Sequence, residues 1–258
     1  RVRLDNGDLI NANKDVDELI AIAKAHPKVV GATPQLHWYG LFMPDRAGAI
    51  LKRPMDASIE LVEIVGIDFE TEGTASNFND SLVEEYLKKP IIGADCTVGR
   101  VEDPSHPFAP LPPPKGSERT RPGRPIIVGE ALAYRWQLRR GANVTLFSVT
   151  LDDEGQPNEQ PVNDRFQVVG SFRSKDNEMD GRRVYIDRRD LQDWLQQEPW
   201  SNVIVKLEDY ERDKLVVQQD LAKSLHEAGF LRSGDISFTS EIRTWEDFRD
   251  QLLRAIKN

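Results

Sequence analysis

The stretch that decides the fold is residues 125–194, which begins, after Pro125, with Ile-Ile-Val-Gly-Glu-Ala-Leu-Ala at 126–133. It continues through Gly-Ala-Asn-Val-Thr-Leu at 141–146, Phe-Gln-Val-Val-Gly-Ser-Phe at 166–172 and Val-Tyr-Ile-Asp at 184–187. Short apolar runs rich in β-branched residues, separated by glycine and polar turns, are typical of strands. We therefore expect a mainly β region, with strands at 126–128, 143–150, 165–172 and 183–186 and helices at 130–138 and 188–196.

The regions on either side combine strand and helix patterns. Val203, Val205 and Leu207 alternate as in a half-buried strand, and apolar residues recur at helical spacing in 15–26 and 211–228. We therefore expect the two outer thirds to form one α/β layer that the β-rich middle interrupts, with the two chain ends close together. The fold class that we predict is α+β, a split α/β subdomain interrupted by a β-rich subdomain. The remaining elements that we predict are an extended segment at 29–42, strands at 58–67 and 235–240, and helices at 81–87 and 244–256.

A proline-rich segment at 101–125 lies between the first α/β part of the chain and its β-rich middle. Proline lacks an amide donor for a sheet and cannot continue a helix, so we expect an ordered or partly ordered connection that is extended in places. Two interpretations of Pro104–Pro114 stay open, a loop packed over the junction of the subdomains and a ligand for an aromatic groove. The domain boundaries that we predict are 1–95 and 199–258 for the two parts of the split subdomain, 96–125 for the connection and 126–198 for the insert.

Composition limits the classes of function. The chain has 258 residues, 43 Asp and Glu against 34 Lys and Arg, and a net charge of -9, which argues against nucleic acid as a partner. No apolar run is long enough to span a membrane, and neither a start methionine nor a signal-peptide pattern is present. We therefore expect the chain to be part of a longer protein.

Candidate catalytic and metal-binding residues are few. The sequence contains neither a P-loop nor a Gly-x-Ser-x-Gly elbow, and its four histidines are not clustered. A thiol nucleophile could be built from Cys96 with His106 or His37, and a carboxylate pair is a second route to a hydrolase. The alternative is that Cys96 is a small, partly buried apolar residue. We expect no catalytic residue, no cofactor and no metal, and we expect the charged segments 152–162 and 175–182 to be surface loops.

One apolar group stands between two prolines, Pro34 and Pro44. It follows the expected end of a strand and has two interpretations. Its members are either core residues or an exposed patch that meets an apolar substrate or a partner subunit. The group consists of Trp38, Tyr39, Leu41, Phe42 and Met43.

Four stretches together resemble the extracytoplasmic, or periplasmic core, domain of the MacB/LolC/FtsX-like ABC transporter permeases. Residues 17–34 resemble the opening helix, turn and strand of that domain, and 62–68 its Val-x-Gly-(Ile/Val)-Asp stretch. Residues 125–194 are similar to its series of Ile-(Val/Leu)-Gly-Glu, Gly-x-x-Val-x-Leu and Phe-x-Val-Val-Gly motifs, and 244–253 to its terminal Trp-containing helix. The chain departs from the pattern in its longer proline-rich segment and in the loops that lipoprotein-handling members use, which have no match here.

The resemblance implies a split, porter-like α/β subdomain that carries a β-rich one, lying outside the inner membrane. It implies a non-catalytic domain that relays ATP-driven conformational change to a substrate, which could be a lipoprotein, a lipid or a small molecule. The partners it implies are a cytoplasmic ABC ATPase reached through membrane helices, a second permease copy or paralogue, and a lipoprotein or envelope protein. An alternative is a regulatory scaffold of an FtsX-like complex that controls an envelope enzyme. The sequence names neither the substrate nor the direction of transport.

Overall fold

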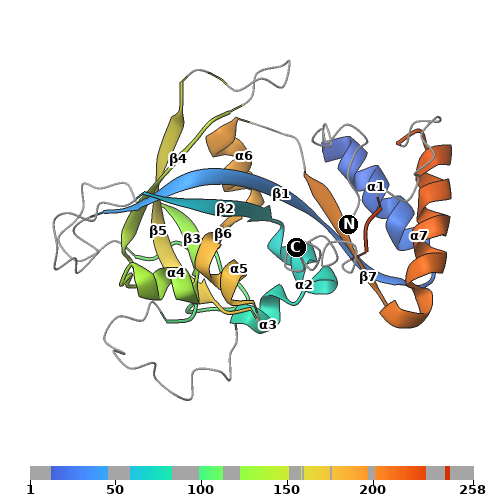
Figure 1. Cartoon of the computed structure of the whole chain (residues 1–258), viewed down its shortest axis with the longest axis horizontal. Coiled ribbons are helices and arrows are strands. Elements are labelled where there is room, and N and C mark those ends of the chain that lie inside the picture. Colours follow the sequence, from blue (N-terminus) through green and yellow to red (C-terminus); the bar gives the residue numbers. More distant parts are fainter. Residues whose placement is uncertain are drawn as a thin grey trace, which may run out of the picture. The chain divides into compact units, whose positions relative to one another are not determined.

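The structure is a computed structural model that describes residues 13–45, 59–82, 99–112, 123–150, 158, 160–174, 176–196, 201–230 and 242–244. It has helices and a mixed sheet, so the fold is α+β (Figure 1). The chain forms two compact units, each built from segments that are distant in sequence. Unit 1 is Arg1–Leu36, Glu70–Ser76 and Glu198–Asn258, and unit 2 is His37–Phe69 and Asn77–Gln197.

Unit 2 is built on a ring of paired strands. The pairings run in the order β2-β6-β3-β5-β4-β1, and β1 also pairs with β2, so the ring closes. The pairs β2–β6 and β3–β5 are parallel and the pairs β3–β6, β4–β5 and β1–β4 are antiparallel. The strands are β1 (Val29–Pro44), β2 (Glu60–Ile67), β3 (Arg124–Gly129), β4 (Asn143–Ser148), β5 (Val162–Phe172) and β6 (Arg183–Asp187).

The described residues of this unit also form the short helices α3 (Phe78–Leu82), α4 (Glu130–Arg135), α5 (Asn177–Arg182) and α6 (Arg188–Leu195). An aromatic group lies in its core, where Tyr185 meets Phe78 and Phe172 edge to face, with both pairs of ring centroids 4.8 Å apart. The proline-rich segment contributes Phe108 and Leu111, which pack against this cluster. The described part of that segment therefore covers apolar core.

Unit 1 contains α1 (Asn13–Ala25), the first half of β1, β7 (Asn202–Leu207) and α7 (Tyr210–Glu227). β1 pairs with β7 antiparallel from Val29–Leu207 to Gln35–Asn202. Most of α2 (Phe69–Ala75) also belongs here. A Cβ on Gly31 would stand 2.2 Å from the carbonyl oxygen of Thr74, so only glycine allows the helix to approach the strand this closely.

The structure differs from the sequence-based expectations in several elements. Residues 177–182 form helix α5 and not a loop, because the side chain of Asp176 accepts hydrogen bonds from the amides of Glu178 and Met179 and caps the helix. Helix α2 was not expected. The helix expected at 130–138 ends already at Arg135, shortly before Gln137, whose φ is 50°.

The compact units also divide the chain differently from the predicted boundaries. Residues 37–69 fall in unit 2 with the β-rich middle, whereas the predicted boundaries assign them to the first part of the split subdomain. The reason is that β2 pairs with β6 and the second half of β1 with β4. The predicted strand 235–240, the predicted helix 244–256 apart from Thr244, residues 83–87 of a predicted helix, and Cys96 lie outside the described residues.

Gly129→Ala tests the close approach at the end of β3. An added Cβ would stand 2.1 Å from the carbonyl oxygen of Asp180, so backbone must move, and we expect a loss of about 1–3 kcal/mol of unfolding free energy. Urea unfolding of the purified chain measures it. The matched control is Gly181→Ala, where the nearest atom is the flexible guanidinium end of Arg135 and helix propensity favours alanine. Equal stability of the two variants would contradict the prediction.

Candidate functional site

An apolar groove lies on the outside of the strand ring of unit 2. Its volume is about 460 Å³. It is lined by neighbouring parts of β1 and β4, by one residue of β2 and by Pro161 ahead of β5. The lining residues are His37, Trp38, Tyr39, Gly40, Leu41, Leu61, Phe147, Ser148, Val149 and Pro161.

The groove is both open and apolar. Tyr39 is 62% exposed, Leu61 60%, Val149 42% and Leu41 41%, although all are large apolar or aromatic side chains. The pairing of β1 with β4 places Leu41 directly opposite Phe147, which is half-buried. Apolar side chains therefore gather on this surface across strands and not at a single position.

The five residues singled out from the sequence do not share one environment. Phe42 is fully buried and belongs to the core, whereas Tyr39 and Leu41 are exposed. Trp38 and Met43 are half-buried. The indole of Trp38 donates to the carbonyl oxygen of Val149 at 3.1 Å, which fixes the ring against the end of β4. Trp38, Tyr39 and Leu41 line the groove, and Phe42 and Met43 do not.

A charged cluster adjoins the groove at His37. The Nδ1 of His37 lies 2.6 Å from Oε1 of Glu63, and Arg183 donates to the other carboxylate oxygen from Nε at 2.8 Å and Nη2 at 2.6 Å. Burial alone would raise the pKa of Glu63, but the hydrogen bond from His37 and the charge of Arg183 outweigh it and lower this pKa to about 2. Glu63 is therefore ionised and shared between two basic groups.

A second cluster places three carboxylates around Arg124. Its Nε donates to Asp164 at 2.8 Å and its Nη1 to Asp190 at 3.0 Å, while Nη2 meets Asp193. Burial would lower the pKa of the Arg124 guanidinium. The hydrogen bonds that Arg124 donates to Asp193 and Asp164 outweigh this effect of burial, so the pKa of Arg124 is raised. The arrangement ties the start of β3 to β5 and α6. Carboxylates held by one arginine are not the separated acid and base that a hydrolase needs.

The Ser-His-Asp side chains at Asp103, Ser105 and His106 do not form a catalytic triad. The Ser105 hydroxyl and the Asp103 carboxylate approach the same ring nitrogen of His106, Nδ1, at 3.1 and 2.9 Å. A triad needs the serine on one nitrogen and the acid on the other. Ser148 in the groove is also engaged, since its hydroxyl donates to the carbonyl oxygen of Tyr39 at 2.7 Å.

Cys96, the candidate thiol nucleophile, lies outside the described residues. Within the part of the chain that the structure describes, no three His, Cys, Asp or Glu side chains are grouped so as to hold a metal ion. No described helix combines the length and the apolar character needed to cross a membrane.

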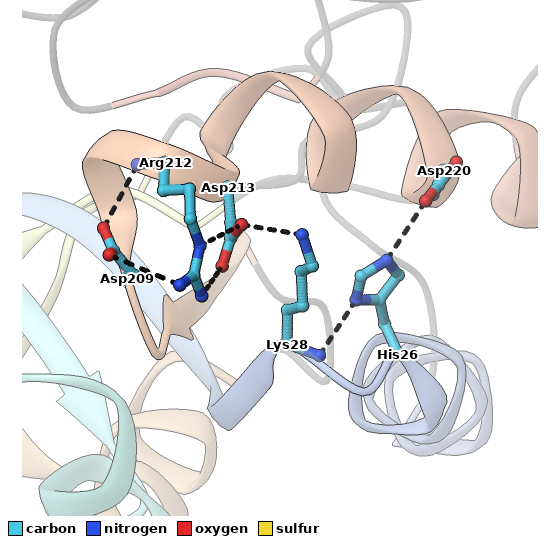
Figure 2. A network of polar contacts seen from close by, with 6 residues as sticks. All are labelled: His26, Lys28, Asp209, Arg212, Asp213 and Asp220. Carbon is cyan, nitrogen blue, oxygen red and sulfur yellow. Dashed lines mark hydrogen bonds and ion pairs between the residues drawn. The ribbon is translucent and has the colours of Figure 1, made fainter.

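Unit 1 has its own polar network between α7 and the turn that joins α1 to β1 (Figure 2). The buried carboxylate of Asp213 accepts from Lys28 Nζ at 2.6 Å and from Arg212 Nε at 3.0 Å, and these two bonds lower the pKa of Asp213, with Arg212 contributing most. His26 accepts from the amide of Lys28 through Nδ1, so its Nε2 carries the proton and donates to Asp220 at 3.2 Å. The network fixes the turn after α1 against α7 and is structural.

Solved structures of two transporter domains are similar to this chain. The chain is similar to the extracellular domain of the noncanonic ABC-type transporter YknZ from Gram-positive bacteria, at 12% identity and a TM-score of 0.43, covering 84% of this chain and 83% of that one. It is also similar to the periplasmic region of MacB from Actinobacillus actinomycetemcomitans, at 10% identity and a TM-score of 0.42, covering 85% and 81%. No protein-family model and no curated protein matches the chain. Likenesses of this degree do not by themselves assign a function.

Sequence reasoning missed most of the groove. Leu61, Phe147 and Val149 each stand in a strand or at its end, and nothing in a single strand shows that their faces adjoin Tyr39. The available signal is that Leu61 and Glu63 occupy alternate positions of β2 and so share one face of the strand. Whether this face of β2 points outward follows only from the pairings that close the ring of strands.

The ionised state of Glu63 makes a pH-dependent contribution to stability. Because its pKa falls from 4.5 to about 2 on folding, the contribution is complete above pH 4.5 and is lost as the pH falls toward 2. We expect wild type to exceed Glu63→Gln by about 2–3 kcal/mol in unfolding free energy at pH 6, with the difference vanishing near pH 2. Urea unfolding across this range measures it, and Glu178→Gln in an exposed pair with Arg182 is the control. A difference that persists unchanged at pH 2 would contradict the assignment.

Asp213→Asn should destabilise unit 1 clearly more than Asp220→Asn. The first removes a buried negative charge that faces two cations, and the second removes an exposed one that faces a single histidine. We expect the Tm to fall by several degrees for Asp213→Asn and by at most about 1 °C for Asp220→Asn. Circular dichroism melting of the two variants provides the comparison, and equal losses would be the contrary result.

Proposed function

We propose that this chain is the extracytoplasmic domain of an ABC transporter permease of the MacB/LolC/FtsX-like kind, and that it acts by binding and not by catalysis. The observation that carries the proposal is the open apolar groove on unit 2, where the polar side chains His37 and Ser148 already have partners within the unit. Ser148 is bonded to a backbone carbonyl, and the Nδ1 of His37 faces Glu63, which Arg183 also holds. Such a surface supplies affinity for an apolar partner and no nucleophile.

The order of the motifs at 17–34, 62–68, 125–194 and 244–253 supports the same assignment. In this proposal unit 1 is the split porter-like subdomain and unit 2 the β-rich one that it carries. A cytoplasmic ABC ATPase drives the cycle through membrane helices outside this chain, and a second permease copy or paralogue completes the transporter. The domain lies outside the inner membrane and relays the ATP-driven change to its substrate, a role that includes release of lipoproteins.

A regulatory scaffold that controls an envelope enzyme, as in FtsX-like complexes, is a second candidate. The openness of the groove favours it, because side chains that are half exposed cannot enclose a small molecule. In that role the groove would hold a protein and the relay would control the activity of that protein.

Labelling from outside the cell tests the proposed location. Leu215 in α7 is exposed, so Leu215→Cys in a Cys96→Ser background offers one reactive thiol on unit 1. In intact cells that carry the whole protein, after the outer membrane is permeabilised where one is present, a membrane-impermeant maleimide should label this thiol. Val217→Cys is the matched control, because Val217 is buried and its thiol should react only after denaturation. Labelling of position 215 only after lysis would overturn the proposal.

A further inference from the structure

Residues 101–112, the described part of the proline-rich segment, lie on the aromatic cluster of unit 2 and are called the strap below. Val101 and Pro107 are buried, and Phe108 and Leu111 are half-buried and pack against the cluster. The rest of the strap is exposed. The strap therefore covers aromatic and apolar side chains of its own unit with a small number of contacts.

The start of the strap is pinned to β5. The carbonyl oxygen of Gly99 accepts from both the amide and the hydroxyl of Ser171, each at 2.9 Å. Val101 lies directly on Gly170, where an added Cβ would stand 2.6 Å from the amide nitrogen of Val101. The chain therefore leaves β5 from a fixed point.

Beyond its first residue the strap is held by side-chain packing. Its backbone hydrogen bonds are internal, since the amide of His106 donates to the carbonyl oxygen of Asp103 at 3.1 Å and the amide of Ala109 to that of His106 at 2.9 Å. An ion pair from Arg140 reaches Glu102 at 3.7 Å, but Glu102 is exposed, so the pair contributes little. Within the described part of the chain, no backbone hydrogen bond ties the strap beyond its first residue to a strand.

The strand beneath is held in a different way. β5 pairs with β3 on one side and with β4 on the other, and Phe166 in its middle is fully buried. Segments with few buried side chains and few hydrogen bonds to the rest of a protein open at a lower free energy than its core strands do. The packing of the strap can therefore be lost while the pairing of the strands is kept.

We infer that the strap is a releasable cover, which leaves the aromatic cluster from its fixed point at Gly99–Val101 while the ring of strands stays folded. The folded unit then has two states, and the open one exposes apolar surface that the closed one hides. Anything that binds one of these states better than the other shifts their populations. The inference concerns a conformational device of unit 2 and does not depend on the proposed function.

Native-state proteolysis of the purified chain tests the inference. Chymotrypsin cuts after phenylalanine in a locally unfolded chain, so cutting of the bond between Phe108 and Ala109 reports release of the strap. The bond between Phe166 and Gln167 lies within β5 and is cut only when the ring of strands opens. Initial rates at each bond are measured by mass spectrometry and divided by the rate in a short peptide of the same sequence.

We expect the bond after Phe108 to be cut at least about tenfold more slowly than in its peptide, and at least about tenfold faster on this scale than the bond after Phe166. Leu111→Ala should speed cutting after Phe108 by roughly three- to tenfold, because a half-buried contact is lost, and should leave the bond after Phe166 unchanged. Glu102→Gln is the matched control, since it removes only an exposed ion pair and should change either rate by less than about twofold.

Three results would overturn the inference. Cutting after Phe108 at the rate of the peptide would mean that the strap is not docked. Equal scaled rates after Phe108 and Phe166 would mean that the strap opens only when the whole unit unfolds. A Leu111→Ala variant that is cut like the wild type would mean that this side chain does not hold the strap closed.

Discussion

Strand β1 is the constraint on which both units depend. Its 16 residues run without a break from unit 1 into unit 2, and its first part pairs with β7 while its last part pairs with β4. Side chains on a strand alternate between two faces, so the register that buries Phe42 also leaves Tyr39 and Leu41 outside. The groove is therefore a direct consequence of how β1 is paired, and it cannot move without breaking the ring of strands.

Charged side chains in both units connect elements of the fold to one another. Asp213, Glu63 and the carboxylates around Arg124 each face cations from distant parts of the chain. These contacts hold elements of the fold together, and for Glu63 and Asp213 they also lower the pKa of the carboxyl, away from the neutral range that acid–base catalysis requires. The groove on unit 2 is apolar and open, and this is the observation on which the proposed binding function rests.

The elements that sequence predicted well are those with a strong periodic signal. The alternation of Val203, Val205 and Leu207 predicted strand β7, and the apolar period of 211–228 predicted α7 to within one residue at each end. Helix α5 was missed because its six residues contain no apolar period, and its signal was the cap at Asp176. Helix α2 was missed because Gly and Thr lie within it, and the structure shows it docked closely on Gly31. That contact joins positions some 40 residues apart, which no local pattern can show.

The candidate site was only partly predictable for the same reason. The apolar group near Trp38 was visible in the sequence, but its division into core and surface depends on which face of β1 the other strands cover. Phe147 joins the groove through the pairing of β4 with β1, and Leu61 joins it through the pairing of β2 with β1. A site built from three strands is a property of pairing register, and single-sequence reasoning has no access to the register of distant strands.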